Sequence, residues 1–151
     1  MQRWQHCQCG NNLILGIGTD LVRVERFAAW AHYPSTKIER IFSAAELQDC
    51  LLQNGQYSPE KLAVRFAAKE AFYKALSAAL FKLELTDSTF SLLATCKAVS
   101  VSKDNSWDLP QLVIDWSVIG QLVKKAVPQM QAQLSISHET TLAVAFVTLS
   151  R

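Results

Sequence analysis

The chain has 151 residues, of which 50% are hydrophobic and 19% are charged, and its formal net charge is +2. This length and composition fit one compact domain with a buried core, and so mild a charge gives no sign of a nucleic-acid-binding protein. No stretch approaches the unbroken apolar length that spans a bilayer, so we expect no membrane insertion.

The first twelve residues, MQRWQHCQCGNN, contain no apolar segment of the kind found in secretion signals. We therefore expect a cytoplasmic protein whose four cysteines are reduced thiols rather than a disulfide framework. His6, Cys7 and Cys9 lack the second ligand pair that a structural metal site needs, so residues 1–12 are interpreted as a tail. Residues 13–151 are predicted to form the single domain.

A short apolar run, Leu13-Ile-Leu-Gly-Ile-Gly18, predicts the first strand, and its glycines suggest a backbone that passes close to another element. Hydrophobic residues then recur at helical spacing from Leu21 to Ala31, which predicts a helix. Asp20 is therefore expected at or near a helix N-terminus, where a carboxylate commonly acts as an N-cap.

Two short helices are predicted next, over residues 35–42 and after the capping box Ser43-Ala-Ala-Glu46. Ser58 and Pro59 provide an N-cap and a first-turn proline for a further helix, and no glycine or proline interrupts it before about Leu80. This is the longest helix predicted in the chain.

On the long helix, Glu70 shares one stripe with Ala63, Ala67 and Lys74. The small alanine side chains leave room for a backbone, a ligand or a second subunit to approach the carboxylate. Two ordinary explanations stay open at this point. Alanine is the best helix former, and Glu70 with Lys74 makes a favourable i,i+4 ion pair.

Residues 97–103 and 111–115 predict a β-hairpin, and residues 117–127 predict one more helix. Residues 133–138 and 142–149 predict two adjoining antiparallel strands. The last strand is apolar on both faces, so one face should meet the core and the other a helix layer or a second subunit. Because strands and helices do not alternate as βαβ units, we predict an α+β fold with a mostly antiparallel sheet packed against the long helix.

The chain also contains three segments whose order and spacing resemble the holo-acyl-carrier-protein synthases, the short bacterial phosphopantetheinyl transferases. They are GIGTDLVRVERF at residues 16–27, RFAAKEAFYKAL at 65–76 and SISHETTLAVAFVTL at 135–149. The resemblance implies the 4'-phosphopantetheinyl transferase fold. It also implies transfer of the phosphopantetheine arm from coenzyme A to a serine of an apo acyl carrier protein, with release of adenosine 3',5'-bisphosphate.

The same resemblance implies that Asp20 and Glu70 ligate Mg²⁺. Attack on a diphosphate requires neutralisation of its charge, and Mg²⁺ commonly takes one or two carboxylates together with phosphate oxygens and water. Lys74, one turn beyond Glu70, is predicted to meet the coenzyme A diphosphate. These three residues are the predicted catalytic residues. The sequence leaves open whether a metal-bound hydroxide or a carboxylate deprotonates the serine.

Four side chains are predicted contacts of coenzyme A besides Lys74: Arg65, Lys69, Ser137 and His138. The first two could reach the nucleotide phosphates or be solvated. His138 ends a strand, where an imidazole can contact phosphate, and its alternative is a structural histidine.

Arg23 and Arg26 are predicted to receive the acidic acyl carrier protein, and Arg26 matches an arginine with that role in the family. The alternative is a solvated basic face. The resemblance further implies a homotrimer with active sites shared between neighbouring subunits, which would explain the apolar outer face of the last strand.

The chain departs from the family pattern in two places. Family members usually continue after Lys-Ala-Leu into a Gly-Thr-Gly loop that wraps the coenzyme, whereas residues 77–81 here continue the helical pattern. The family hairpin is kept only in part, by Asn105 and Pro110 around a turn without glycine. We therefore expect an altered adenine pocket. Two alternatives stay open: a non-catalytic coenzyme A or carrier-protein binding module, and an oligomeric interaction domain in which Asp20 caps and Glu70 pairs.

Overall fold

The computed structural model describes residues 13–85, 90–103 and 109–151. Its elements follow in chain order: β1 (Ile14–Arg23), the 3₁₀ turns η1 (Val24–Phe27) and η2 (Trp30–His32), α1 (Ser35–Ile38), α2 (Ala44–Cys50), α3 (Pro59–Lys82), α4 (Leu92–Thr95), β2 (Val99–Lys103), β3 (Pro110–Ile114), α5 (Trp116–Val123), β4 (Gln131–His138) and β5 (Leu142–Ser150).

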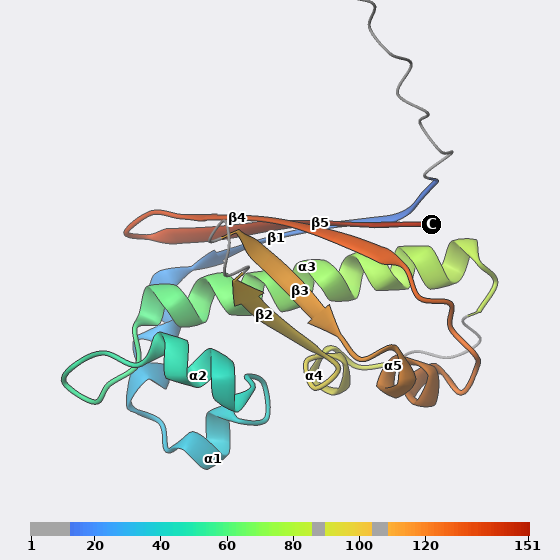
Figure 1. The fold of residues 1–151 in the computed structure, drawn as a ribbon. Coiled ribbons are helices and arrows are strands. Elements are labelled where there is room, and N and C mark those ends of the chain that lie inside the picture. The colour runs from blue at the N-terminus through green and yellow to red at the C-terminus, as the bar shows by residue number, and fades with distance from the viewer. Residues whose placement is uncertain (1–12, 86–89, 104–108) are drawn as a thin grey trace, which may run out of the picture.

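A three-stranded antiparallel sheet of order β1-β5-β4 lies along one side of α3, and the four other helices lie on the opposite side (Figure 1). The antiparallel hairpin of β2 and β3 forms a second sheet beside α3. This arrangement confirms the predicted α+β fold, with antiparallel sheets packed against a long helix.

The helix start signals of the sequence are realised as predicted. Ser43 Oγ accepts a hydrogen bond from the Glu46 amide at 3.3 Å, and the Glu46 carboxylate accepts one from the Ser43 amide at 2.8 Å. Ser58 Oγ accepts from the Lys61 amide at 3.2 Å, with Pro59 in the first turn of α3. These bonds satisfy amide groups that a helix N-terminus otherwise leaves free.

The glycines of β1 allow the strand to touch the backbone of α3. A Cβ added to Gly18 would lie 1.9 Å from the carbonyl oxygen of Ala71, and one added to Gly16 would lie 2.0 Å from that of Ala75. Both distances are far below any real contact, so only glycine fits at these positions. The predicted close approach of the backbone is therefore confirmed, and the alanines of α3 provide the other side of the contact.

The predicted helix from Leu21 to Ala31 is wrong. β1 continues to Arg23, and two 3₁₀ turns follow it. Val22 is buried while Leu21 and Arg23 are exposed, which is the two-residue period of a strand. Pairing of this segment with β5, as far as Arg23 opposite Leu142, outweighs its local helical spacing.

The later elements agree with the sequence apart from one boundary. The hairpin and the two C-terminal strands are present, and α3 continues through Phe81 as the sequence predicted. The helix predicted to reach residue 127 ends at Val123, because Lys124 adopts a left-handed backbone with φ 56°. The predictions for residues 1–12, for Asn105 and for its turn lie outside the described residues.

α3 is the centre of the hydrophobic core, since buried side chains project from it in every direction. The sheet packs on it from one side through Ala143, Ala145, Val147 and Leu149, all of which are fully or almost fully buried. Among the residues that the structure describes, no helix combines the length and the apolar character that crossing a membrane requires.

Candidate active site

Asp20 lies in the middle of β1 on the face of the sheet that meets α3. Its register partner Ala145 is fully buried, and the Asp20 side chain itself is only 8% exposed. Because alternate residues of a strand share a face, Gly16, Gly18 and Asp20 all point toward the helix. The two glycines bring β1 close enough for this carboxylate to reach the side chains of α3.

Asp20, Glu70 and Lys74 meet where β1 crosses α3. Lys74 Nζ donates a hydrogen bond to Asp20 Oδ1 at 2.9 Å and another to the Thr19 carbonyl oxygen at 3.0 Å. Its distance to Glu70 Oε1 is 3.7 Å. The structure thus brings together all three predicted catalytic residues from two separate elements.

The N-cap interpretation of Asp20 is wrong, because Asp20 lies within a strand. The residue that precedes η1 is Arg23, and no side chain caps that turn. Asp20 Oδ1 accepts from Lys74, whereas Asp20 Oδ2 is buried without a hydrogen-bond partner. An orphaned buried carboxylate oxygen is costly unless something binds it.

These carboxylates fit a hard divalent cation. Mg²⁺ prefers oxygen ligands and commonly uses only one or two protein carboxylates, which Asp20 and Glu70 supply from one point of the fold. The unpartnered Asp20 Oδ2 provides further capacity to bind a cation. Within the described parts of the chain, no group of three or more His, Cys, Asp or Glu side chains forms a larger metal site.

The hydrogen bond to Asp20 is the main cause that raises the pKa of the Lys74 ammonium above its ordinary value, and the charges of Asp20 and Glu70 add to it. Lys74 is therefore positively charged at neutral pH. Its side chain remains 45% exposed, so the ammonium stands at the surface of the site.

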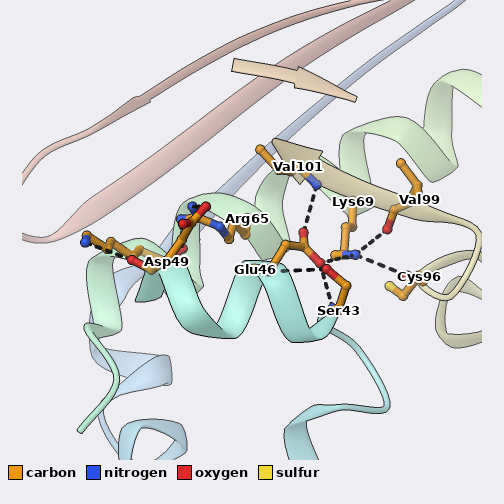
Figure 2. A network of polar contacts seen from close by, with 9 residues as sticks. Ser43, Glu46, Asp49, Arg65, Lys69, Cys96, Val99 and Val101 are labelled. Carbon is orange, nitrogen blue, oxygen red and sulfur yellow. Dashed lines mark hydrogen bonds and ion pairs between the residues drawn. The ribbon is translucent and has the colours of Figure 1, made fainter. Parts of the chain in front are cut away.

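Lys69 lies elsewhere, in a fully buried network on the far side of α3 (Figure 2). Its ammonium is 3.0 Å from Glu46 Oε2 and donates to the carbonyl oxygens of Cys96 and Val99. All three of its donors are used inside the protein. This placement does not support the expectation that Lys69 contacts a nucleotide.

Arg65 is also buried, one turn before Lys69. It donates to Asp49 Oδ2 at 3.2 Å and to the Lys61 carbonyl oxygen at 3.3 Å (Figure 2). Only 8% of its side chain is exposed. Arg65 therefore ties α2 to α3 and is not a solvated cation, and its contact with a phosphate stays a prediction.

Ser137 and His138 end β4 at a distance from the carboxylates. Ser137 pairs with Val144 on the outer face of the sheet, and His138 pairs with Ala143. Hydrogen bonds from its own amide and from Ser58 lower the pKa of Glu60, and the charge of His138 adds to this effect. His138 thus lies by the first turn of α3, which is about 15 Å along the helix from Glu70.

Arg23 and Arg26 are exposed at the end of β1 and in η1. Arg23 pairs with Glu25 at 3.3 Å, and 73% of each side chain is exposed. Arg26 lies 6.0 Å from the ring centre of Phe27. The structure gives both arginines a solvent-facing position on a turn instead of the predicted helix.

Glu46 is the residue whose role the sequence did not indicate. Its capping-box pattern predicted one hydrogen bond within α2, and the structure adds the ion pair with Lys69 and a bond from the Val101 amide at 2.9 Å. No local signal points to these partners, because they lie 23 and 55 residues away in the chain.

Comparison with known proteins identifies the family of the chain. The model of the 4'-phosphopantetheinyl transferase superfamily matches residues 16–122. The holo-[acyl-carrier-protein] synthase of Treponema denticola is 35% identical over 137 residues, which are 91% of this chain and 98% of that protein. The synthase of Treponema pallidum is 32% identical over 91% of this chain and 96% of its own length.

Solved structures show the same similarity. The ACPS-CoA complex from Chronobacterium ammoniagenes has a TM-score of 0.68 and 30% identity, covering 89% of this chain and 95% of that one. A holo-(acyl-carrier-protein) synthase from Bacillus anthracis in complex with CoA (3',5'-ADP) has a TM-score of 0.61 and 25% identity over 91% and 96% of the two chains.

The fold, the convergent carboxylates and these matches define an enzyme class, and the chain belongs to the 4'-phosphopantetheinyl transferase superfamily. Within that superfamily it is of the holo-[acyl-carrier-protein] synthase type.

Proposed function

We propose that the protein transfers the 4'-phosphopantetheine group of coenzyme A to a serine hydroxyl of an apo acyl carrier protein, in a reaction that depends on Mg²⁺. The observation that carries the proposal is the convergence of Asp20, Glu70 and Lys74 where β1 crosses α3. The bound coenzyme A of the related Chronobacterium structure supports the same substrate.

The reaction forms a bond between the serine oxygen and the phosphorus that carries the pantetheine arm. It breaks the bond from that phosphorus to the bridging oxygen of the diphosphate, so adenosine 3',5'-bisphosphate leaves and the serine proton passes to a base. When bound, Mg²⁺ supplies charge neutralisation of the diphosphate and of the leaving group. Asp20 and Glu70 would hold the ion, and Lys74 would place its ammonium against the diphosphate.

Ser137 and His138 enter the proposal through a neighbouring subunit. Within one chain, His138 lies by the first turn of α3, and Glu70 is nearly three turns further on. A site shared between two copies of the chain would bring the end of β4 in one copy to the carboxylates of another. We therefore propose the homotrimer with shared sites that the family resemblance implies.

The outer face of the sheet supports assembly. Large apolar side chains on β1 and β5 point away from α3 into solvent, and they include Ile17, Leu21, Leu142, Val144 and Phe146, each at least 37% exposed. A contiguous apolar face of this kind is typical of an interaction surface. We propose that it is buried between subunits, as the apolar pattern on both faces of the last strand predicted.

The carrier protein would dock beside the site through Arg23 and Arg26. Both guanidinium groups are exposed and follow Asp20 closely in the chain, so an acidic partner bound to them would lie near the carboxylates. We retain the prediction of a cytoplasmic enzyme.

One observation favours a second candidate, a non-catalytic module that binds coenzyme A or a carrier protein. α3 continues without a break through residues 77–81, where the resemblance implies a coenzyme-wrapping Gly-Thr-Gly loop. The retention of both carboxylates and of Lys74 favours the enzyme.

The test is to incubate the protein with coenzyme A, Mg²⁺ and an apo acyl carrier protein and to weigh the carrier by mass spectrometry. We expect the mass of the phosphopantetheine arm to be added. Asp20→Asn and Glu70→Gln should each lower the rate by at least about 100-fold, whereas Glu39→Gln, which changes an exposed carboxylate after α1, should leave it unchanged. If the folded protein adds no mass, a coenzyme A titration identifies or excludes the binding module.

A further inference from the structure

The ammonium of Lys74 stands between the two carboxylates of the site. Its acceptors are Asp20 Oδ1 at 2.9 Å and the Thr19 carbonyl oxygen at 3.0 Å, and Glu70 Oε1 lies 3.7 Å away. All of these oxygens belong to the place where a cation is proposed to bind. Lys74 therefore supplies the positive charge of this site in the free protein.

The two oxygens of Asp20 have different surroundings. Asp20 Oδ2 is buried and has no hydrogen-bond partner, whereas Oδ1 accepts the hydrogen bond from Lys74. A divalent cation that uses Asp20 Oδ1 therefore competes with the ammonium for this oxygen.

The two cations also repel each other. Mg²⁺ binds carboxylate oxygens at about 2.0–2.1 Å, so a metal on Asp20 would lie within a few ångströms of an ammonium hydrogen-bonded to the same oxygen. Two carboxylates carry charge −2, which Lys74 reduces to −1. The site of the free protein thus attracts a divalent cation less than its two carboxylates alone would.

We propose that Lys74 is a placeholder cation, which holds Asp20 and Glu70 together until the anionic diphosphate of coenzyme A draws its ammonium away and a divalent cation takes the position. This inference rests on the proposed function and adds an order to it, because the metal then binds strongly only together with the coenzyme. The Lys74 side chain is 45% exposed, so its flexible stem can swing outward without disturbing the core.

The experiment measures Mn²⁺ binding to the full-length protein without coenzyme A, by electron paramagnetic resonance of the free ion. Lys74→Gln removes the charge and keeps a hydrogen-bond donor, and Lys74→Met serves as a second neutral variant. We expect both to bind Mn²⁺ at least about tenfold more tightly than the unchanged protein. Adding Asp20→Asn to Lys74→Gln should abolish the gain.

Two control variants separate this effect from a general change in charge. Lys74→Arg keeps the positive charge and should leave the Mn²⁺ affinity low. Lys82→Met removes a lysine of the same helix that donates in the same way to a β1 carbonyl, that of Ile14 at 3.0 Å. It should also leave the affinity unchanged, because no carboxylate of the site contacts it.

The outcomes distinguish the inference from the function on which it rests. Equal Mn²⁺ affinity in the unchanged protein and in both neutral Lys74 variants, each shown to be folded by circular dichroism, overturns the placeholder role. A tenfold gain in Lys82→Met overturns it as well. Failure of the unchanged protein to modify an apo carrier protein overturns the proposed function instead, because the Mn²⁺ comparison requires neither coenzyme nor carrier.

Discussion

Glu46 Oε2 and Lys69 Nζ lie 3.0 Å apart with both side chains completely buried. The pair also binds backbone groups of β2, since Lys69 donates to the Val99 carbonyl and the Val101 amide donates to Glu46. Val99 and Val101 lie on either side of Ser100 in β2. Their backbone carbonyl and amide groups therefore face the edge of β2 that β3 does not cover. The ion pair thus fastens the hairpin to α2 and α3.

Lys69→Met should lower the free energy of unfolding by about 3–5 kcal/mol, because it leaves the Glu46 carboxylate buried without its partner. The measurement is urea denaturation followed by circular dichroism. The control is Lys61→Met on the same helix, whose exposed ammonium donates to the Asp49 carbonyl oxygen and should contribute less than about 1 kcal/mol. Equal losses in the two variants would contradict the assigned role of the buried pair.

Gly18→Ala should destabilise the protein by more than about 2 kcal/mol and reduce transfer activity, because the new Cβ would collide with the Ala71 carbonyl oxygen and push Asp20 away from α3. Thermal unfolding and the transfer assay measure the two effects. Gly120→Ala in α5 is the control, and its stability should change by less than about 1 kcal/mol. A Gly18 variant with unchanged activity would show that the backbone contact does not set the carboxylate spacing.

Phe146→Asp should convert the proposed oligomer into monomers, because it places a charge in the apolar outer face of the sheet. Analytical ultracentrifugation gives the assembly state. Phe81→Asp is the matched control, since Phe81 is 79% exposed at the end of α3, away from that face. If the unchanged protein is already monomeric, the shared-site proposal fails.

The thiols of Cys50 and Cys96 should not react with a thiol reagent at pH 8 in the native state, because burial raises the pKa of each to about 11. A Cys7→Ser/Cys9→Ser background restricts the assay to these two. Both should react fully in denaturant. Rapid labelling of either thiol in the native protein would show that the core around Lys69 opens.

The same shifts predict a pH dependence of stability. The unfolded thiols lose their protons from about pH 9, whereas the folded ones keep theirs until about pH 11, so the free energy of unfolding falls as the pH rises through this range. Denaturation at pH 8 and pH 10 measures the fall. It should be smaller in a Cys50→Ala/Cys96→Ala variant, and an equal fall in both proteins would assign it to other groups.

Arg26→Ala should raise the KM for the acyl carrier protein about tenfold with little change in kcat, and the effect should shrink at high salt. Steady-state kinetics at two ionic strengths measure both. Lys97→Ala changes an exposed cation in another part of the fold and should leave KM unaltered. A lowered kcat with unchanged KM would place Arg26 in the chemistry instead of the docking.

The sequence predicted the structure correctly where residues close together in the chain determine the local conformation. The capping box at Ser43 and the start of α3 at Ser58 were read correctly, because their hydrogen bonds join residues three apart. The segment after Asp20 was misread, since its strand depends on pairing with β5 over a hundred residues later.

The candidate site also contains residues that the sequence could identify and residues that it could not. Asp20, Glu70 and Lys74 could be named from motifs, and the structure brings them together. Lys69 could not be distinguished from a solvated cation, because its partner Glu46 comes from α2. No sequence pattern around either residue predicts that they form an ion pair. Residues 137 and 138 stay predictions, because a single chain holds them apart from the carboxylates.

The position of α3 has a consequence for the integrity of the molecule. The three-stranded sheet on one side of α3 and the small helices on the other both pack buried apolar side chains onto this helix. A break inside α3 should therefore unfold both layers. It should also separate Asp20 from Glu70 and Lys74. Two fragments made by dividing the chain within residues 59–82 should therefore not reassemble into a folded protein when mixed.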